Sequence, residues 1–148
     1  MSTIEQIVNQ IGIQAKVASK ELARISGARK NQALLAMAKH ILANEKIIIT
    51  SNEKDIKSAK QKGLSESFID RLKLNSESIN SIANTLKDIA SFEDPVGKVL
   101  ANWTRPNGLQ LSRVSTSLGV IGIIYASRHN VTADAGALCL NSGNASIL

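Results

Sequence analysis

Residues 118–148 read LGVIGIIYASRHNVTADAGALCLNSGNASIL, and this stretch decides the fold. The apolar run Gly119–Tyr125 is typical of a buried strand, and the small residues of Thr132–Leu140 favour a helix. The polar turn Asn141–Asn144 then leads to Ala145–Leu148, which reads as the opening of a second strand buried on both faces. A strand, a helix and a strand in this order predict the first β-α-β of a doubly wound parallel sheet. Because such a strand requires neighbours, we expect the front part of a larger α/β protein.

The preceding residues predict a cover of helices. Apolar residues recur at alternating steps of four and three along one helix face, until Ser26-Gly27 interrupts the pattern. Such a repeat could also suggest a coiled coil, but two of its seven positions are alanine, so we expect a helix whose stripe faces a globular core. The residues of this stripe are Ile4, Val8, Ile11, Ala15, Ala18, Leu22 and Ile25. A helix is also expected at the β-branched run Ile47–Ile49, because no strong turn residue isolates it as a strand. A longer helix is expected from an N-cap at Ser76 to about Asp94-Pro95.

The dipeptide Asn107-Gly108 marks a β-hairpin. It predicts a type I′ turn, whose two central residues need positive φ, between strands over Val99–Arg105 and Leu109–Val114. Two long strands with mixed apolar and polar faces are not stable alone. We therefore expect the hairpin to lie on another sheet or on a partner subunit.

The chain divides into three expected parts. Residues 1–95 form a helical cover, residues 96–117 form a protruding hairpin arm, and residues 118–148 form the first β-α-β of the sheet. The expected fold class is α/β, with these parts making the amino-terminal part of a Rossmann-type domain.

Composition narrows the class of protein. The single cysteine, Cys139, excludes an internal disulfide framework and fits a reducing compartment. The first residues show no basic segment followed by an apolar stretch, so no signal peptide is expected. The most apolar run, Val120–Tyr125, is too short to span a bilayer. We expect a cytoplasmic protein without a membrane partner.

The net charge of +6 is concentrated in residues 1–62, which hold eleven Lys and Arg against five Asp and Glu. Such a surplus suits nucleic-acid binding. However, the lysines have no interleaved aromatic residues for base stacking, so we prefer a solvated helix face and expect no nucleic-acid partner. These lysines are Lys16, Lys20, Lys30, Lys39, Lys46, Lys54, Lys57, Lys60 and Lys62.

One loop carries the candidate chemistry. Residues 125–132 follow the first strand and lead into a helix, at the edge where open α/β sheets bind ligands. The amide of Asn130 could donate to a developing oxyanion there, but Asn130 or Thr132 could equally cap the helix. Elsewhere the two histidines are too far apart to suggest a metal site. Cys139 lies on an apolar helix without a neighbouring cation, which favours an inert buried thiol.

Several stretches are similar to one enzyme family. They are KNQALLAMAKHILAN (30–44), GLSESFIDRLKL (63–74) and the whole of residues 94–148. The most specific segments are WTRPNGL (103–109), LGVIGIIY (118–125) and NVTADA (130–135). On these segments the chain resembles γ-glutamyl phosphate reductase, also called glutamate-5-semialdehyde dehydrogenase, of the aldehyde dehydrogenase superfamily. The resemblance covers essentially all 148 residues, whereas full-length members are much longer.

The resemblance implies an oxidoreductase of proline biosynthesis. Such an enzyme reduces γ-glutamyl phosphate to glutamate 5-semialdehyde with NADPH, through a thioester on a cysteine. It makes Asn130 the candidate oxyanion-hole donor, and it places Tyr125 and Ser127 along the cofactor. The hairpin of residues 96–117 becomes an oligomerisation arm, and the fold becomes the amino-terminal part of an aldehyde-dehydrogenase-like cofactor-binding domain.

The chain also departs from the usual family residues. The departures are Ala126 for Glu, His129 for Pro, Gly136 for Ala, Asn141 for Lys and Ser146 for Val. The family's nucleophilic cysteine and basic cofactor motif would both lie beyond Leu148. We therefore expect a shortened reductase-like chain that is inactive by itself and a poor binder of NADP(H). Two alternatives stay open, namely one part of a split reductase and a non-catalytic interaction module.

Overall fold

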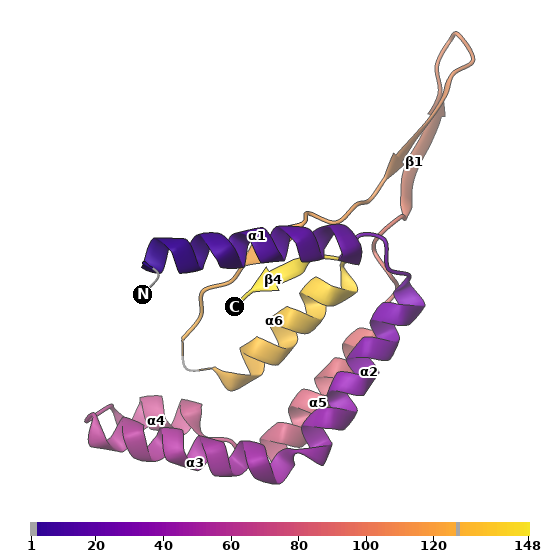
Figure 1. Ribbon diagram of the computed structural model, residues 1–148. Helices are drawn as coiled ribbons and strands as arrows, with labels where there is room; N and C mark the ends of the chain where they lie inside the picture. Colours follow the sequence, from indigo (N-terminus) through magenta and orange to yellow (C-terminus); the bar gives the residue numbers. More distant parts are fainter. Residues whose placement is uncertain (1–2, 127) are drawn as a thin grey trace.

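The structure is a computed structural model that describes residues 3–126 and 128–148 (Figure 1). Five helices precede a hairpin, and a strand, a helix and a strand follow it. In chain order they are α1 (Ile4–Leu22), α2 (Gly27–Ala43), α3 (Glu45–Gln61), α4 (Glu66–Leu72), α5 (Ser76–Ala90), β1 (Val99–Thr104), β2 (Gln110–Val114), β3 (Val120–Gly122), α6 (His129–Asn141) and β4 (Ala145–Ile147). This content confirms the α/β class, with a helical cover, a protruding hairpin and one β-α-β unit.

Strands β3 and β4 form a small parallel sheet between two helices. Val120 pairs with Ala145 and Gly122 with Ile147. Helix α1 lies on one face and α6 on the other (Figure 1). The first strand is shorter and less buried than expected over Gly119–Tyr125, because it pairs on one side only and Ile124 beyond it is fully exposed.

The largest core lies where α2, α5 and α6 meet. Leu34, Ala83, Leu86 and Ala137 are completely buried there, and the partly buried side chain of Leu140 packs against this cluster. Removing such side chains from water is the main stabilising contribution to this part of the fold. The run at residues 47–49 lies inside α3, which confirms the prediction of helix over strand.

Two boundaries differ from the sequence predictions. Helix α5 is capped by Asn75 rather than Ser76, because the Asn75 side chain accepts a hydrogen bond from the Ser78 N–H at 2.8 Å. The helix ends at Ala90, four residues before Asp94, and the segment that follows is free to turn towards the hairpin. The last helix begins at His129 rather than Thr132.

The apolar stripe of α1 is covered only in part. Ala15 and Leu22 are half-buried, whereas Ile4, Val8 and Ile11 are 81%, 62% and 41% exposed. The expectation that the whole stripe faces a core is therefore wrong for its first half.

The hairpin of β1 and β2 stands away from the body of the molecule (Figure 1). The expected type I′ turn is wrong, because Gly108 N–H donates to Arg105 O at 2.9 Å and places Pro106 and Asn107 at the turn centre. Proline holds φ near −65°, which suits a type I turn and not a type I′ turn. Gly108 follows with φ +85°, and Arg105 N–H closes the loop on Leu109 O at 2.8 Å. A type I turn followed by a left-handed glycine is the usual three-residue hairpin loop.

Lys30 is a buried cation and not part of a solvated face, contrary to expectation. Its side chain is 1% exposed, and its Nζ donates to Asp94 Oδ1 at 2.7 Å and to Asn141 O at 2.8 Å. Asp94 in turn accepts from the Val96 N–H at 3.0 Å, at the base of the hairpin. Gly27 allows this approach, since a Cβ there would lie 2.7 Å from Asp94 Oδ2. Lys30 therefore joins α2, the hairpin base and the end of α6.

Candidate functional site

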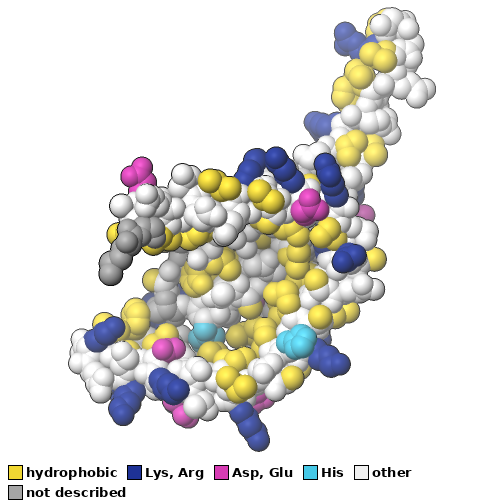
Figure 2. Space-filling view, viewed as in Figure 1, with side chains coloured by type: hydrophobic (Ala, Val, Ile, Leu, Met, Phe, Trp, Pro, Cys, Tyr) yellow, Lys and Arg dark blue, Asp and Glu magenta, His cyan; other side chains and the backbone are white. Residues whose placement is uncertain are grey.

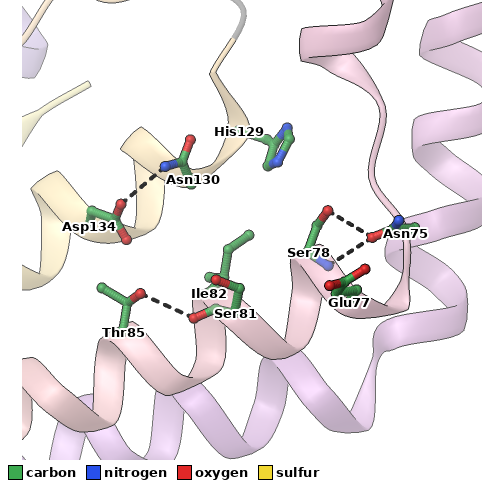
Figure 3. Close-up of a pocket in the computed structure, with 9 residues that line it drawn as sticks. All are labelled: Asn75, Glu77, Ser78, Ser81, Ile82, Thr85, His129, Asn130 and Asp134. Atoms are coloured by element: carbon green, nitrogen blue, oxygen red, sulfur yellow. Dashed lines mark hydrogen bonds between the residues drawn. The ribbon is translucent and has the colours of Figure 1, made fainter.

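A polar pocket of about 440 Å³ lies between the first half of α5 and the start of α6 (Figure 3). Helix α6 contributes His129, Asn130 and Asp134 to its wall. Helix α5 and its cap contribute the opposite wall, which consists of Asn75, Glu77, Ser78, Ser81, Ile82 and Thr85. The structure thus places the sequence-predicted Asn130 on a pocket.

Asn130 does not cap α6. The cap position belongs to Arg128, which makes no side-chain capping bond, and Asn130 lies inside the first turn of the helix. Thr132 does not cap the helix either, because its hydroxyl is hydrogen-bonded to the Tyr125 hydroxyl. The capping explanation for both residues is therefore wrong, and Asn130 remains a residue of the pocket wall.

Asp134 accompanies Asn130 one helical turn further along. The Asn130 Nδ2 donates to Asp134 Oδ2 at 3.4 Å, which is a long hydrogen bond (Figure 3). Burial raises the pKa of Asp134 by more than this hydrogen bond lowers it. Asp134 Oδ1 and His129 Nδ1 are buried without a hydrogen-bond partner among the described residues.

This pair sets a condition for oxyanion stabilisation by Asn130. One N–H of the amide points to Asp134, and the other remains for a ligand. A charged carboxylate so close would oppose negative charge on the ligand, whereas a neutral carboxyl would not. Burial raises the pKa of Asp134 and so shifts this balance towards the neutral form.

The predicted cofactor residues lie at the carboxyl end of β3. Tyr125 is 37% exposed, and its hydroxyl ties this strand end to the first turn of α6. Ser127 lies outside the described residues. Beyond the two strands, Ile124 and Leu148 are exposed, and the described residues there include no glycine-rich turn for a pyrophosphate.

Cys139 is a structural thiol, as expected. It is 5% exposed on α6, and burial raises its pKa, so it carries no thiolate at neutral pH. It follows Asn130 by nine residues on the same helix, which separates the two by about 13 Å along the axis. Cys139 therefore cannot attack an acyl group held by Asn130.

No group of three His, Cys, Asp or Glu side chains in residues 3–126 and 128–148 is placed to hold a metal ion. No described helix combines the length and apolarity needed to cross a membrane. Lys and Arg side chains are scattered over the face in Figure 2 and do not gather into one patch.

Sequence reasoning missed the α5 wall of the pocket. Asn75, Ser78, Ser81 and Thr85 follow helical steps of three, three and four, and they flank the buried stripe that contains Ile82. This polar periodicity is visible in the sequence. However, it is also typical of a solvated helix face, and only the tertiary fold shows that it faces α6.

Comparison with known proteins gives the family. A γ-glutamyl phosphate reductase from Allorhizobium ampelinum is 54% identical over 145 residues, which is 98% of this chain. One from Brucella suis is 50% identical over the same length. The crystal structure of γ-glutamyl phosphate reductase from Saccharomyces cerevisiae matches all of this chain with a TM-score of 0.90 at 34% identity. The chain corresponds to the amino-terminal third of the γ-glutamyl phosphate reductase family.

The match covers little of each relative. This chain spans 34% of the length of the A. ampelinum reductase and 37% of the yeast structure. The crystal structure of γ-glutamyl phosphate reductase from Thermotoga maritima also matches, with a TM-score of 0.86 at 36% identity. That match includes 89% of this chain and 32% of the T. maritima chain. No family model matches the sequence.

Proposed function

We propose that this chain supplies the oxyanion-binding side of a γ-glutamyl phosphate reductase active site. The whole enzyme would convert γ-glutamyl phosphate to L-glutamate 5-semialdehyde with NADP(H), in the cytoplasm and on the route to proline. The observation that carries the proposal is the position of Asn130, which does not cap α6 and lines the pocket between α5 and α6.

In this proposal Asn130 acts on the acyl oxygen. An acyl phosphate develops negative charge on its carbonyl oxygen when a nucleophile adds to the carbon. The free Nδ2–H of Asn130 would donate to that oxygen, while Asp134 holds the other N–H and fixes the amide plane. The hydroxyls of Ser78, Ser81 and Thr85 would solvate the substrate from the opposite wall.

In this proposal the nucleophile and the hydride donor come from groups other than residues 1–148. Cys139 is buried, and nine residues of α6 separate it from Asn130. We therefore expect no catalysis from the chain alone. The purified chain should show no consumption of NADPH with γ-glutamyl phosphate, and no reduction of NADP⁺ with glutamate 5-semialdehyde, above the rate in buffer. Turnover above that rate, proportional to chain concentration, would overturn the assignment.

The first alternative is that this chain is one part of a split reductase. Turnover after mixing with a second polypeptide distinguishes a split reductase from a shortened chain that has lost its activity. A second polypeptide that resembles the rest of the relatives should restore turnover on mixing, whereas a remnant should stay inactive with any such polypeptide.

The hairpin supports a second alternative, an interaction module that joins copies of the chain. Trp103 is 46% exposed and faces the same side of the hairpin as its partner Leu111, and Val99 at the start of the same strand is 52% exposed. Exposed aromatic and aliphatic side chains on an isolated hairpin are typical of an interface. No nucleic-acid partner is included in the proposal.

Replacing Trp103 with Glu tests this hairpin interface. We expect the wild-type chain to elute as a dimer or larger species in size-exclusion chromatography with light scattering, and Trp103→Glu to elute as a monomer. Asn102→Glu serves as the control, because Asn102 lies on the opposite face of the same strand. A wild-type chain that is monomeric at high concentration, or equal elution of the two variants, would contradict the hairpin interface.

A further inference from the structure

The wall of the pocket between α5 and α6 contains two carboxyl groups and, among the described residues, no lysine or arginine. The carboxyl groups are those of Glu77, in the first turn of α5, and Asp134, in the middle of α6. Figure 3 shows His129 and Ser78 at one end of the pocket and Asp134 and Thr85 at the other. A wall of this composition favours a positively charged ligand group over an anionic one.

Two hydroxyls of α5 face this pocket as hydrogen-bond acceptors. Ser78 Oγ donates its proton to Asn75 Oδ1 at 2.8 Å, and Thr85 Oγ1 donates to the backbone oxygen of Ser81 at 3.1 Å. A hydroxyl has one proton and two acceptor lone pairs. Because both protons are used within the helix and its cap, the two oxygens are left to accept hydrogen bonds from a ligand.

His129 adds an acceptor on the α6 wall. Its Nδ1 is buried and has no hydrogen-bond partner among the described residues. An imidazole nitrogen accepts a hydrogen bond when the ring proton lies on the other nitrogen. A buried polar atom without a partner is unfavourable, so a ligand that donates to Nδ1 gains binding energy. The acceptors on the two walls together favour a ligand group with several donors.

Glu77 is the carboxylate that suits an ion pair with such a group. Its side chain is exposed and forms no ion pair among the described residues. Asp134 suits it less, because its Oδ2 is held by Asn130 and burial raises its pKa. A metal ion is a poor fit, since the described residues place no group of three His, Cys, Asp or Glu side chains together.

We propose that Glu77, Ser78 and His129 bind the α-ammonium group of an amino-acid substrate whose acyl group is held by Asn130. An ammonium has three N–H donors, one for each of these acceptors, and its charge pairs with the Glu77 carboxylate. The inference rests on the proposed function, whose substrate carries an ammonium at one end and the reacting acyl group at the other. It makes Glu77 a residue that determines specificity for amino-acid derivatives.

Two ligands that differ only in the ammonium group test this assignment. L-Glutamate γ-methyl ester carries the group, and monomethyl glutarate lacks it. Each is titrated into the full 148-residue chain, and the shifts of backbone amide NMR signals give the dissociation constants. The ester should bind about tenfold more tightly than monomethyl glutarate and should shift the signals of Ser78 and Asn130. Propylamine, which has an ammonium but no acyl group, should bind more weakly than the ester.

Glu77→Gln removes the charge and keeps the size of the side chain. It should weaken binding of the ester by about fivefold, a modest loss because Glu77 is exposed, and should not weaken binding of monomethyl glutarate. Glu66→Gln is the matched control, since Glu66 is an exposed glutamate in the first turn of α4 and does not line the pocket. Thermal melts of both variants separate loss of binding from loss of fold.

The outcomes distinguish the ammonium site from the function. A preference for the ester that is lost in Glu77→Gln and kept in Glu66→Gln supports the site. Equal binding of the ester and monomethyl glutarate, equal binding of the ester and propylamine, equal effects of the two variants, or no saturable shift at about 10 mM ester would overturn it. Turnover after mixing with a second polypeptide is scored separately. Selection for the ester without turnover contradicts the proposed function alone, and turnover without that selection contradicts the ammonium site alone.

Discussion

Replacing Lys30 with alanine is expected to lower the free energy of unfolding by about 3 kcal/mol. The ammonium group is 1% exposed and holds both Asp94 Oδ1 and Asn141 O, so its removal leaves a carboxylate and a helix-end carbonyl without their donor. Chemical denaturation followed by circular dichroism measures the change. Lys39→Ala, at an exposed position of the same helix, should change the free energy by less than about 0.5 kcal/mol.

The loss in Lys30→Ala should depend on pH. Burial alone would raise the pKa of Asp94, but the hydrogen bonds from Lys30 and Val96 and the Lys30 charge outweigh it and lower the pKa. A carboxyl with a lowered pKa in the folded state stabilises the fold above its unfolded pKa of about 3.9. That stabilisation is lost as the pH falls through the folded pKa. The difference in the free energy of unfolding between wild type and variant should thus be full at neutral pH and narrow in acid, where the bond to the Asn141 carbonyl remains. A difference that persists unchanged at pH 2 would contradict the Lys30–Asp94 pair.

In the reconstituted reductase, replacing Asn130 with alanine is expected to lower kcat by about 10²–10³. The expected cause is loss of the Nδ2–H donor to the acyl oxygen at the α6 side of the pocket. An interaction made only in the transition state lowers kcat and kcat/KM together and leaves KM unchanged. Steady-state NADPH oxidation over a range of substrate concentrations measures both constants.

Asn84→Ala is the control for this variant. Asn84 is an exposed asparagine of α5 that lies outside the pocket lining. It should leave kcat and KM as in the wild type. A rise in KM with an unchanged kcat for Asn130→Ala would assign Asn130 to ground-state binding and not to the oxyanion.

The hydrophobic pattern predicted most of the fold. Steps of three and four located the helices, and the sequence of strand, small-residue helix and strand predicted the β-α-β unit. The pattern could not show which part of an apolar face is covered. Ile4 and Val8 belong to the same stripe as Leu22, but the two-stranded sheet reaches only the second half of α1.

Predictions from a short motif or a single residue were wrong where another residue changed the local structure. Asn107-Gly108 alone predicts a type I′ turn, but Pro106 before it fixes φ and moves the turn by one residue. Lys30 is one lysine among many in sequence, and only the distant Asp94 and Asn141 explain its burial.

The sequence predicted a residue of the α6 wall of the pocket but none of the α5 wall. The position of Asn130 after a predicted strand made it a candidate site residue. Whether it instead caps α6 depends on the hydrogen bonds at the start of that helix, which the sequence does not show. The opposing α5 wall depends on the packing of two helices whose pocket residues, such as Ser81 and Asn130, lie about fifty positions apart in sequence. Sequence periodicity carries no information on such pairings.

The hydrogen bonds of Lys30 also have a consequence for the order of folding. Its Nζ donates to Asp94 and to Asn141, which are 64 and 111 positions away in the sequence. Contacts that close loops of this length cost chain entropy, whereas helices form from local contacts. The Lys30 contacts should therefore form late in folding, after α2, α5 and α6 have come together.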